Sequence, residues 1–386
     1  MNHSIKNSNN GRLPPTTQKG FSLVELMIAM VIGVSLMAGV VQVAVSSKTS
    51  FVVGEELSRL QENSRFALDV MTDDIRTAGY LGFSIADGSL ITTVTANPPP
   101  TVTFDAASMI KGYHWDGSNW SPSIPAVDTA LGTVVSGTDI IIIQSGSDCG
   151  GQLISTMANA NNPVQVHQGN TCNIQDGDIL VISDYTHMDV FKVKSTNAPG
   201  AAKLNIVHSV GNNAACNPNG PGAIACNTQN NLGTTYGTDS EILVVQSMTY
   251  FIRNGANGSP ALWRLNNNTS AVEELVEGVE DLEILYGVDS DAIGTSGYGV
   301  VDQYIDADTV DVDGTGTWDW ADVISVRLAL LVKTSSDNVL SEAQDFTFLA
   351  ATAPAAISAA SAVTPSDLAV RRTLSTTIQL RNRGLQ

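Results

Sequence analysis

An apolar stretch near the N-terminus constrains this chain more than any other feature of its sequence. It runs from Phe21 to Val45 and contains one charged residue, Glu25, near its start. A helix of about 25 residues is long enough to cross a hydrocarbon core of roughly 30 Å. A lone carboxylate is costly in lipid, and where one occurs it tends to serve a function and to have a nearby partner. The sequence therefore predicts a membrane-anchored chain in which Glu25 needs a cation.

The residues before this stretch have the charge of an export signal but an unusual order. Lys6, Arg12 and Lys19 are basic, and the first 20 residues contain no acid. An ordinary secretory signal places its apolar core before the cleavage site, so the core is lost on processing. Here the small residue, Gly20, precedes the apolar core. Cleavage after Gly20 would leave the apolar segment as the N-terminus of the mature chain.

The residues around Gly20 also form a specific motif. Residues 19–27, KGFSLVELM, resemble the class III signal of type IV pilins and pseudopilins. In that family a prepilin peptidase cuts after the glycine and methylates the new N-terminal amine. The resemblance therefore implies cleavage between Gly20 and Phe21 and methylation of the Phe21 amine.

Further segments resemble the PilW-like minor pilins. LQENSRFA at 60–67 and DDIRTAGY at 73–80 are similar to the end of that family's long helix, and residues 371–384 are similar to its C-terminus. The resemblance covers both ends of the chain, whereas the part from residue 81 to about residue 270 shows little of it.

Processing would supply the cation that Glu25 needs. The amine of Phe21 would lie four residues before Glu25, and the carboxylate could pair with this amine in the same subunit or in a neighbour during assembly. The alternative is that Glu25 lies among lipid headgroups as part of an ordinary signal anchor. The spacing, the glycine and the basic flank together favour the pilin interpretation.

The hydrophobic pattern predicts an α+β fold, in which a long N-terminal helix precedes an antiparallel β-rich head. Apolar and small residues continue at helical spacing beyond the span, and Gly79 is a natural helix stop. The expected buried stripe is Leu57, Leu60, Ser64, Ala67, Met71, Ile75 and Ala78, opposite the charged residues Glu55, Arg59, Glu62, Asp69 and Asp73. We therefore expect a nearly continuous helix from Phe21 to Ala78.

After Gly79 the pattern changes to short strands bounded by turn residues. Strands are expected at 139–144, 178–183, 189–194, 204–209, 241–253, 262–265, 322–334 and 371–383, with a short acidic turn running into a strand at 272–286. The resulting division of the chain is a leader at 1–20, a transmembrane and assembly segment at 21–48, a periplasmic helical segment at 49–79, and a head at 80–386 that has room for an inserted subdomain around 139–235.

Composition excludes several classes of function. A net charge of −19 argues against a nucleic-acid surface, which would need clustered Lys and Arg. The five histidines show no metal-binding pair, and GSDCG at 146–150 has Asp148 where a nucleophile elbow needs Ser or Cys. We therefore expect a protein that is not an enzyme, with histidines that are exposed or satisfied by hydrogen bonds.

The four cysteines fall in the part expected to face the oxidising periplasm, where disulfides persist. Four cysteines allow three pairings. We favour the sequence neighbours, Cys149 with Cys172 and Cys216 with Cys226, because each pair would close a loop in a Gly- and Asn-rich stretch.

The resemblance implies a minor pilin of a type IV pilus. Such a subunit acts with other minor pilins and the major pilin to prime filament assembly, and it is expected at or near the tip, where it can support a tip adhesin. Before assembly it would sit in the inner membrane with its head in the periplasm, as a substrate of prepilin peptidase. The alternative is a minor pseudopilin of a type II secretion system, which has the same anchor chemistry.

A calcium site is predicted at residues 311–322, DVDGTGTWDWAD. Counted as an EF-hand-type loop, its ligand positions fall on Asp311, Asp313, Thr315, the Thr317 carbonyl, Asp319 and Asp322. Thr315 replaces the usual Asp or Asn, and Asp322 replaces the usual bidentate Glu. The alternative is a solvated acidic turn before a strand.

Bound calcium would offset repulsion among the four carboxylates, so millimolar calcium is expected to raise the melting temperature of the chain. Thermal melts with calcium and with chelator test this site. A melting temperature that does not respond to calcium, or a response that persists in Asp311→Ala, would leave only the acidic turn.

Overall fold

The structure is a computed structural model that divides the chain into two compact units, residues 1–54 and residues 55–386. It describes residues 20–82, 91–93, 95–96, 109–124, 131–184, 186–200, 202–210, 226–227, 229–291, 294–310, 319–348, 362–363 and 365–382.

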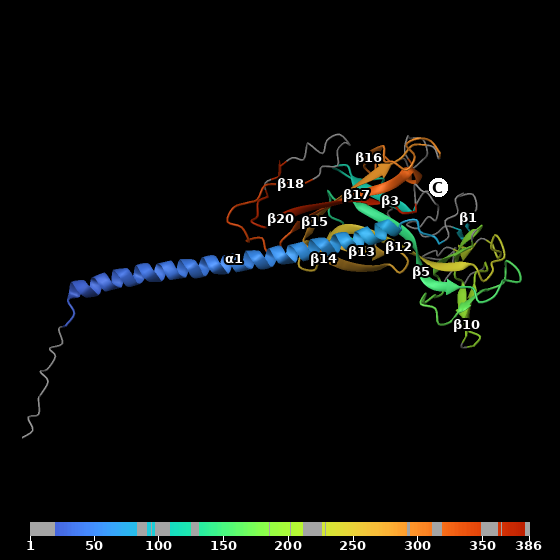
Figure 1. Cartoon of the computed structure of the whole chain (residues 1–386), viewed down its shortest axis with the longest axis horizontal. Helices are drawn as coiled ribbons and strands as arrows, with labels where there is room; N and C mark the ends of the chain where they lie inside the picture. The colour runs from blue at the N-terminus through green and yellow to red at the C-terminus, as the bar shows by residue number, and fades with distance from the viewer. Residues whose placement is uncertain are drawn as a thin grey trace, which may run out of the picture. The chain divides into compact units, whose positions relative to one another are not determined.

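Helix α1 (Leu23–Thr77) is one continuous helix that begins in the first unit and ends in the second (Figure 1). Its ends lie within two residues of the predicted ones. After Thr77 the chain turns at Gly79, whose φ of 74° suits a residue without a side chain. The stop predicted at this glycine is confirmed.

Within the second unit, one face of α1 is buried. The buried residues are Leu60, Ser64, Ala67, Met71 and Ile75, followed by Ala78 just beyond the helix. They recur at steps of three and four, so they form a single stripe, while the charged residues predicted for the opposite face are exposed. The predicted amphipathic pattern is therefore confirmed, except that Leu57 is only half-buried.

The largest sheet in the described part of the chain has nine strands. Eight of them pair antiparallel, and β1 runs parallel to β8. Seven follow the order β1-β8-β7-β12-β5-β3-β4, and β13 and β14 extend from β12. The strands are β1 (Ile91–Thr93), β3 (Ile110–Trp115), β4 (Trp120–Ser121), β5 (Ile140–Gln152), β7 (Ile179–Ser183), β8 (Met188–Lys192), β12 (Glu241–Asn254), β13 (Pro260–Asn266) and β14 (Ala271–Glu277).

The long strand β12 organises this sheet. It pairs with β5 along one edge, and on its other edge it pairs first with β7 and then with β13. The strand thus connects the part of the chain before residue 200 to the part after residue 255.

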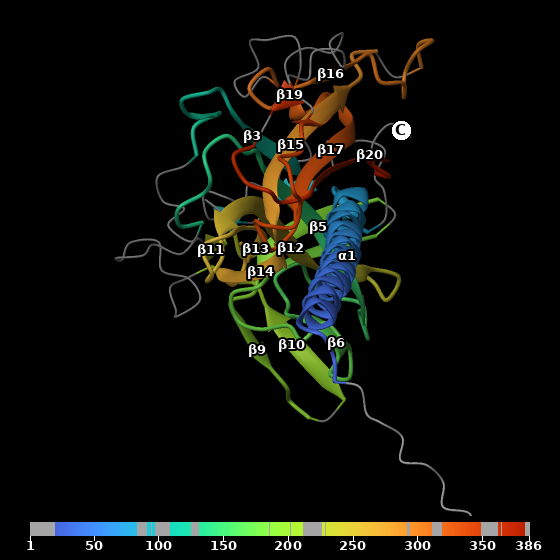
Figure 2. The same ribbon diagram turned by 90° about the vertical axis from the view of Figure 1, so that its left-hand side faces the viewer.

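A second, four-stranded sheet has the order β16-β15-β17-β20 and is entirely antiparallel (Figure 2). Its strands are β15 (Val279–Val288), β16 (Gln303–Ile305), β17 (Val323–Lys333) and β20 (Arg371–Gln379). β20 pairs with β17 over its whole length, which anchors the C-terminal segment in the head.

The prediction for residues 272–286 was wrong in one respect. The acidic part is not a turn but strand β14, and the chain passes from β14 to β15 through a single residue, Gly278. Gly278 has a φ of 84°, and a Cβ there would lie 2.6 Å from the Lys333 carbonyl oxygen. β14 is an edge strand that pairs with β13 and leaves Glu273 and Glu274 exposed, so the acidic residues do not prevent pairing.

Smaller elements complete the described part of the head. They are the three-stranded sheet of β6 (Val164–His167), β10 (Lys203–Val207) and β9 (Ser195–Asn197), the pairs β2 (Thr95–Ala96) with β11 (Cys226–Asn227) and β18 (Phe346–Thr347) with β19 (Ala362–Val363), and a 3₁₀ helix at Trp320–Asp322.

The main hydrophobic core joins the α1 stripe to both large sheets. It contains Ile141 and Ile143 of β5, Tyr250 and Ile252 of β12, and most inward residues of β15 and β17. A separate core, which includes Phe191 and Tyr236, is formed by residues between 153 and 242. The inserted subdomain expected around 139–235 stays a prediction, because a separate core does not by itself define a domain boundary.

Arg371, at the start of β20, connects two strands of the second sheet through its side chain. Its side chain is 5% exposed and makes hydrogen bonds of 2.6 and 2.9 Å to Glu280 and of 2.6 and 2.7 Å to Asp367. The guanidinium lowers the pKa of Asp367 to about 2. Because Glu280 is on β15, this contact spans β17 and connects strands that do not pair with each other.

Replacing Arg371 with Met is expected to lower the free energy of unfolding by about 3 kcal/mol, because two carboxylates lose a buried cation. The exposed neighbour Arg372, changed to Met, is the matched control and should cost little. Asp367 has a lower pKa in the folded chain than when unfolded. Its contribution is therefore complete above about pH 4 and is lost as the pH falls toward 2.

Urea unfolding of the full chain in detergent, measured at pH 7 and at pH 3, checks both points. Equal losses of unfolding free energy in Arg371→Met and Arg372→Met would contradict the role assigned to Arg371. The same holds if the stability of Arg371→Met falls between pH 7 and pH 3 as much as that of the wild type.

Candidate functional site

The first turn of α1 is closed by a capping box between Ser22 and Glu25. The Glu25 amide donates to Ser22 Oγ at 3.1 Å, and the Ser22 amide donates to Glu25 Oε2 at 3.5 Å. These two bonds give side-chain acceptors to backbone amides at the helix start, where a full set of intrahelical acceptors is lacking. Glu25 thus has a local structural role in addition to the charge pairing predicted for it.

Ser22 was not among the predicted site residues. The spacing Ser-x-x-Glu immediately before an apolar run is a known helix-start signature, and it would have identified this residue from the sequence.

The predicted cleavage position lies just before this turn. Gly20 and Phe21 precede the helix, and Phe21 is 85% exposed. A Cβ placed on Gly20 would meet no described atom within 4 Å. Any requirement for glycine at this position would therefore come from an enzyme subsite and not from packing within the chain. Cleavage and methylation stay predictions.

The first unit exposes a large apolar surface. One window of α1 is long and apolar enough to cross a membrane, with a hydropathy of 2.3, and none of that window is buried. The exposed side chains include Leu23, Leu26, Ile28, Val31, Leu36 and Val41. An apolar surface of this kind calls for lipid or other apolar helices to cover it.

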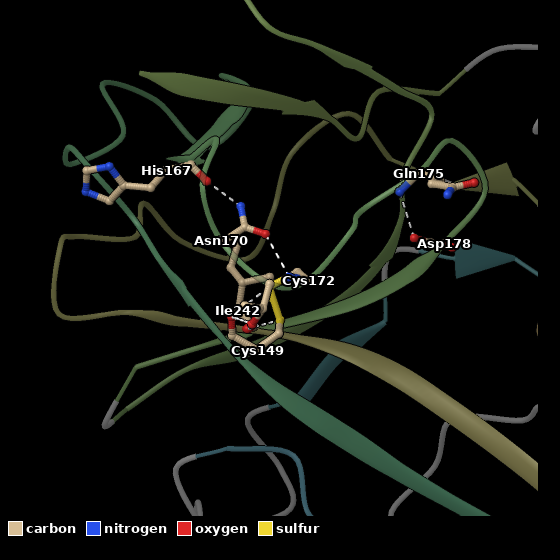
Figure 3. Close-up of a disulfide and its surroundings, with 8 residues drawn as sticks. Cys149, His167, Asn170, Cys172, Gln175, Asp178 and Ile242 are labelled. Carbon is tan, nitrogen blue, oxygen red and sulfur yellow. Dashed lines mark hydrogen bonds between the residues drawn. A yellow bond between two sulfur atoms is a disulfide. The ribbon is translucent and has the colours of Figure 1, made fainter. Parts of the chain in front are cut away.

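The predicted disulfide between Cys149 and Cys172 is confirmed (Figure 3). It ties the segment after β6 to strand β5, where the Thr171 hydroxyl also donates to the Cys149 carbonyl at 2.7 Å. Asn170 holds the turn, because its side chain accepts from the Cys172 amide at 2.9 Å and donates to the His167 carbonyl. Cys216 and the side chain of Cys226 lie outside the described residues, so their pairing stays a prediction.

The predicted calcium loop is only partly described. Asp311, Asp313, Thr315 and Thr317 lie outside the described residues. Asp319 precedes the 3₁₀ helix and Asp322 is its last residue, and the Asp319 amide donates to Asp322 Oδ2 at 2.8 Å. The calcium site therefore stays a prediction.

The histidines of the described head have different surroundings. His167 and His187 are exposed, as the sequence predicts. His208 is buried, and its Nε2 lies 3.0 Å from the Asn162 carbonyl oxygen, whereas its Nδ1 has no hydrogen-bond partner among the described residues. His114 lies 3.0 Å from Asp139, and this hydrogen bond raises the pKa of His114 to about 9. His114 is therefore a cation at neutral pH, paired with a buried carboxylate.

Comparison with protein families gave two matches. Residues 15–41 match the prokaryotic N-terminal methylation motif, and residues 249–382 match the family described as Type IV Pilus-assembly protein W. No curated protein and no solved structure matches the chain.

Each match covers a part of the chain that has been described above. The first covers the predicted cleavage position and the start of α1, and the second extends from β12 through β20, including Arg371. The resemblance to PilW-like minor pilins that the sequence indicated is confirmed. The matches support a type IV pilus minor pilin, and the apolar helix with its methylation motif fits an inner-membrane anchor and incorporation into a pilus.

Proposed function

We propose that this chain is a minor pilin that, after cleavage at Gly20, primes assembly of a type IV pilus and occupies a position at or near its tip. The observation that supports this most is the exposed apolar part of α1, directly preceded by a methylation motif. A helix that exposes apolar side chains all round suits lipid before assembly and the helices of other pilins afterwards.

The two segments of α1 would have different tasks. Residues from Leu60 to Ile75 are committed to the core of the head, whereas residues from Leu23 to Val45 contact nothing in their own unit that buries them. The inner membrane and then the neighbouring minor pilins and major pilin are the proposed occupants of this free surface.

Glu25 would select the position of an incoming subunit. Removing residues 1–20 creates a cationic amine on Phe21, close to the first turn of α1 where Glu25 lies. A carboxylate in an apolar assembly is destabilised until it meets a cation, so correct axial placement is favoured by pairing with a Phe21 amine.

The size of the head supports the proposed tip position. The second unit contains two large sheets and a separate core between residues 153 and 242. A head of this size would crowd the closely spaced repeats of a shaft, whereas a terminal position gives it room and leaves surface for a tip adhesin.

Deleting the gene tests this function. Loss of surface pili and twitching, restored by the wild-type gene, is the expected result. Normal pili with loss of secreted enzymes would instead identify a pseudopilin of a type II secretion system. Crosslinking of intact pili followed by mass spectrometry tests the position, because other minor pilins are the expected neighbours and major pilin on all sides would contradict a tip location.

Two variants expressed in the same deletion strain distinguish the charge of Glu25 from its capping role. Glu25→Gln keeps an acceptor for the capping box but removes the charge, and it is expected to reduce piliation at least about tenfold, because an uncompensated buried amine remains. Ser22→Ala removes a cap worth about 1 kcal/mol but keeps the charge, so piliation should fall only a few-fold.

Pili counted by electron microscopy, with membrane levels of each variant as the control, provide the measurement. Normal piliation in Glu25→Gln together with strong loss in Ser22→Ala would show that capping and not charge is the function of Glu25.

A further inference from the structure

A cluster of ionisable side chains lies where the two large sheets meet, away from the N-terminal segment. His114 is on β3, Asp139 immediately precedes β5, and Glu283 is on β15. One ligand atom from each of these three residues lies within 4.8 Å of the others. Three elements far apart in the sequence thus bring one imidazole nitrogen and two carboxylates together.

Asp139 is the fixed centre of this cluster. Its side chain is 3% exposed and lies 3.0 Å from His114 Nδ1. It also accepts hydrogen bonds from the Ile284 amide at 2.9 Å and the Trp115 amide at 3.3 Å. Its own amide donates to the Leu282 carbonyl at 2.8 Å. The carboxylate is therefore held in place by both sheets.

Several polar atoms around Asp139 are buried without a hydrogen-bond partner among the described residues. They are Glu283 Oε2, Asp306 Oδ1 and the Tyr286 hydroxyl. A buried polar atom without a partner costs about 1–3 kcal/mol, so a ligand that contacts these atoms would remove this cost.

Tyr286 supplies the independent evidence, because its side chain is almost completely enclosed. The residue is 1% exposed, and a Cβ on Gly112 would lie 2.0 Å from its hydroxyl oxygen. Gly112 and His114 are two residues apart on β3 and so share one face of the strand. The unpartnered hydroxyl therefore lies against Gly112, on the same face of β3 as the His114 side chain.

The cluster brings one imidazole together with three carboxyl groups, those of Asp139, Glu283 and Asp306, in a place largely shielded from water. Carboxylates in such a place are costly unless a cation offsets their charge. A divalent ion would do so while giving the unpartnered carboxylate oxygens an electrophilic partner.

We propose that His114, Asp139 and Glu283 bind a divalent transition-metal ion, for which zinc is the best match. Zinc accepts imidazole nitrogen and carboxylate oxygen together, with bonds of about 2.0–2.2 Å and tetrahedral geometry. Calcium and magnesium prefer oxygen ligands alone, so an imidazole argues against them. Water completes the fourth position.

Such an ion would act as a structural link between the sheets. It would connect β3 and the start of β5 in the nine-stranded sheet to β15 in the four-stranded sheet. This role is separate from membrane anchoring and from the calcium loop predicted at 311–322.

A second group of acids, made of the buried Asp289, the partly buried Asp291 and the exposed Asp302, provides the matched comparison. Two of its carboxylates already accept turn hydrogen bonds, from the Gly299 amide to Asp289 at 2.6 Å and from the Ser290 amide to Asp302 at 2.9 Å. This group therefore shows no sign of a missing ligand, and Asp302→Asn is a suitable control variant.

Zinc titration of the full chain tests the proposal. The protein is purified in detergent, stripped with chelator, dialysed and titrated with zinc chloride by calorimetry, and bound zinc is counted by elemental analysis. One zinc per chain that excess calcium does not displace is the expected result. A wild-type chain that binds no zinc would overturn the proposal, whatever the variants do.

The variants locate the ion. Glu283→Gln and His114→Gln are each expected to weaken zinc binding at least about tenfold, whereas Asp302→Asn should bind as wild type does. Two independent ligand variants are used so that poor folding of one, checked by circular dichroism, leaves the other to decide. Unchanged affinity in a folded ligand variant, or loss of binding in Asp302→Asn alone, would overturn the assignment.

Discussion

Burial of one stripe of α1 is the constraint on which the head depends. Leu60, Met71 and Ile75 each remove a large apolar side chain from water, which is worth roughly 1.5–3 kcal/mol per residue. Ser64 and Ala67 lie between them and are fully enclosed, and their small side chains let the helix approach the strands closely. The Tyr250 hydroxyl donates to Asp74 and adds a polar connection from β12 to the same helix. Both large sheets share the core that this stripe completes, so disrupting the helix would disturb both.

The same helix explains why a single chain can be both a folded head and a filament subunit. A stripe is enough to hold the head, because packing needs only one face of a helix. The residues from Leu23 to Val45 are apolar on all faces, which is typical of a segment covered by lipid or by other helices. The change from all-round to one-sided hydrophobicity marks the division between intermolecular and intramolecular packing along α1.

The elements with strong periodicity could be predicted from the sequence. The helix, with its stop at Gly79, and the strands β12, β17 and β20 follow directly from spacing and turn residues. The prediction failed at β14, because the acidic sequence VEELVE was interpreted as a turn when it forms part of an edge strand. The Cys149–Cys172 pair was predicted because it closes a loop in a Gly- and Asn-rich stretch, and it is present.

The cluster around Asp139 could not have been predicted from sequence periodicity or turn residues. His114, Asp139 and Glu283 are spread over the sequence, and they meet only because β3 pairs with β5 while the segment before β5 bonds to the edge of β15. Such long-range register is not encoded in local spacing. By contrast, the calcium site at 311–322 was predicted from local spacing alone, since all of its ligand positions lie within twelve consecutive residues.

The N-terminus of the chain in assembled filaments tests the central claim most directly. Trypsin cuts after Lys and Arg, and none occurs between Phe21 and Lys48, so a processed chain yields a peptide of residues 21–48. The account predicts this peptide with one added methyl group in sheared pili, and the unmethylated peptide of residues 20–48 from a strain that lacks prepilin peptidase. Recovery of residues 20–48, or of peptides from residues 1–19, as the main form in sheared pili would contradict it.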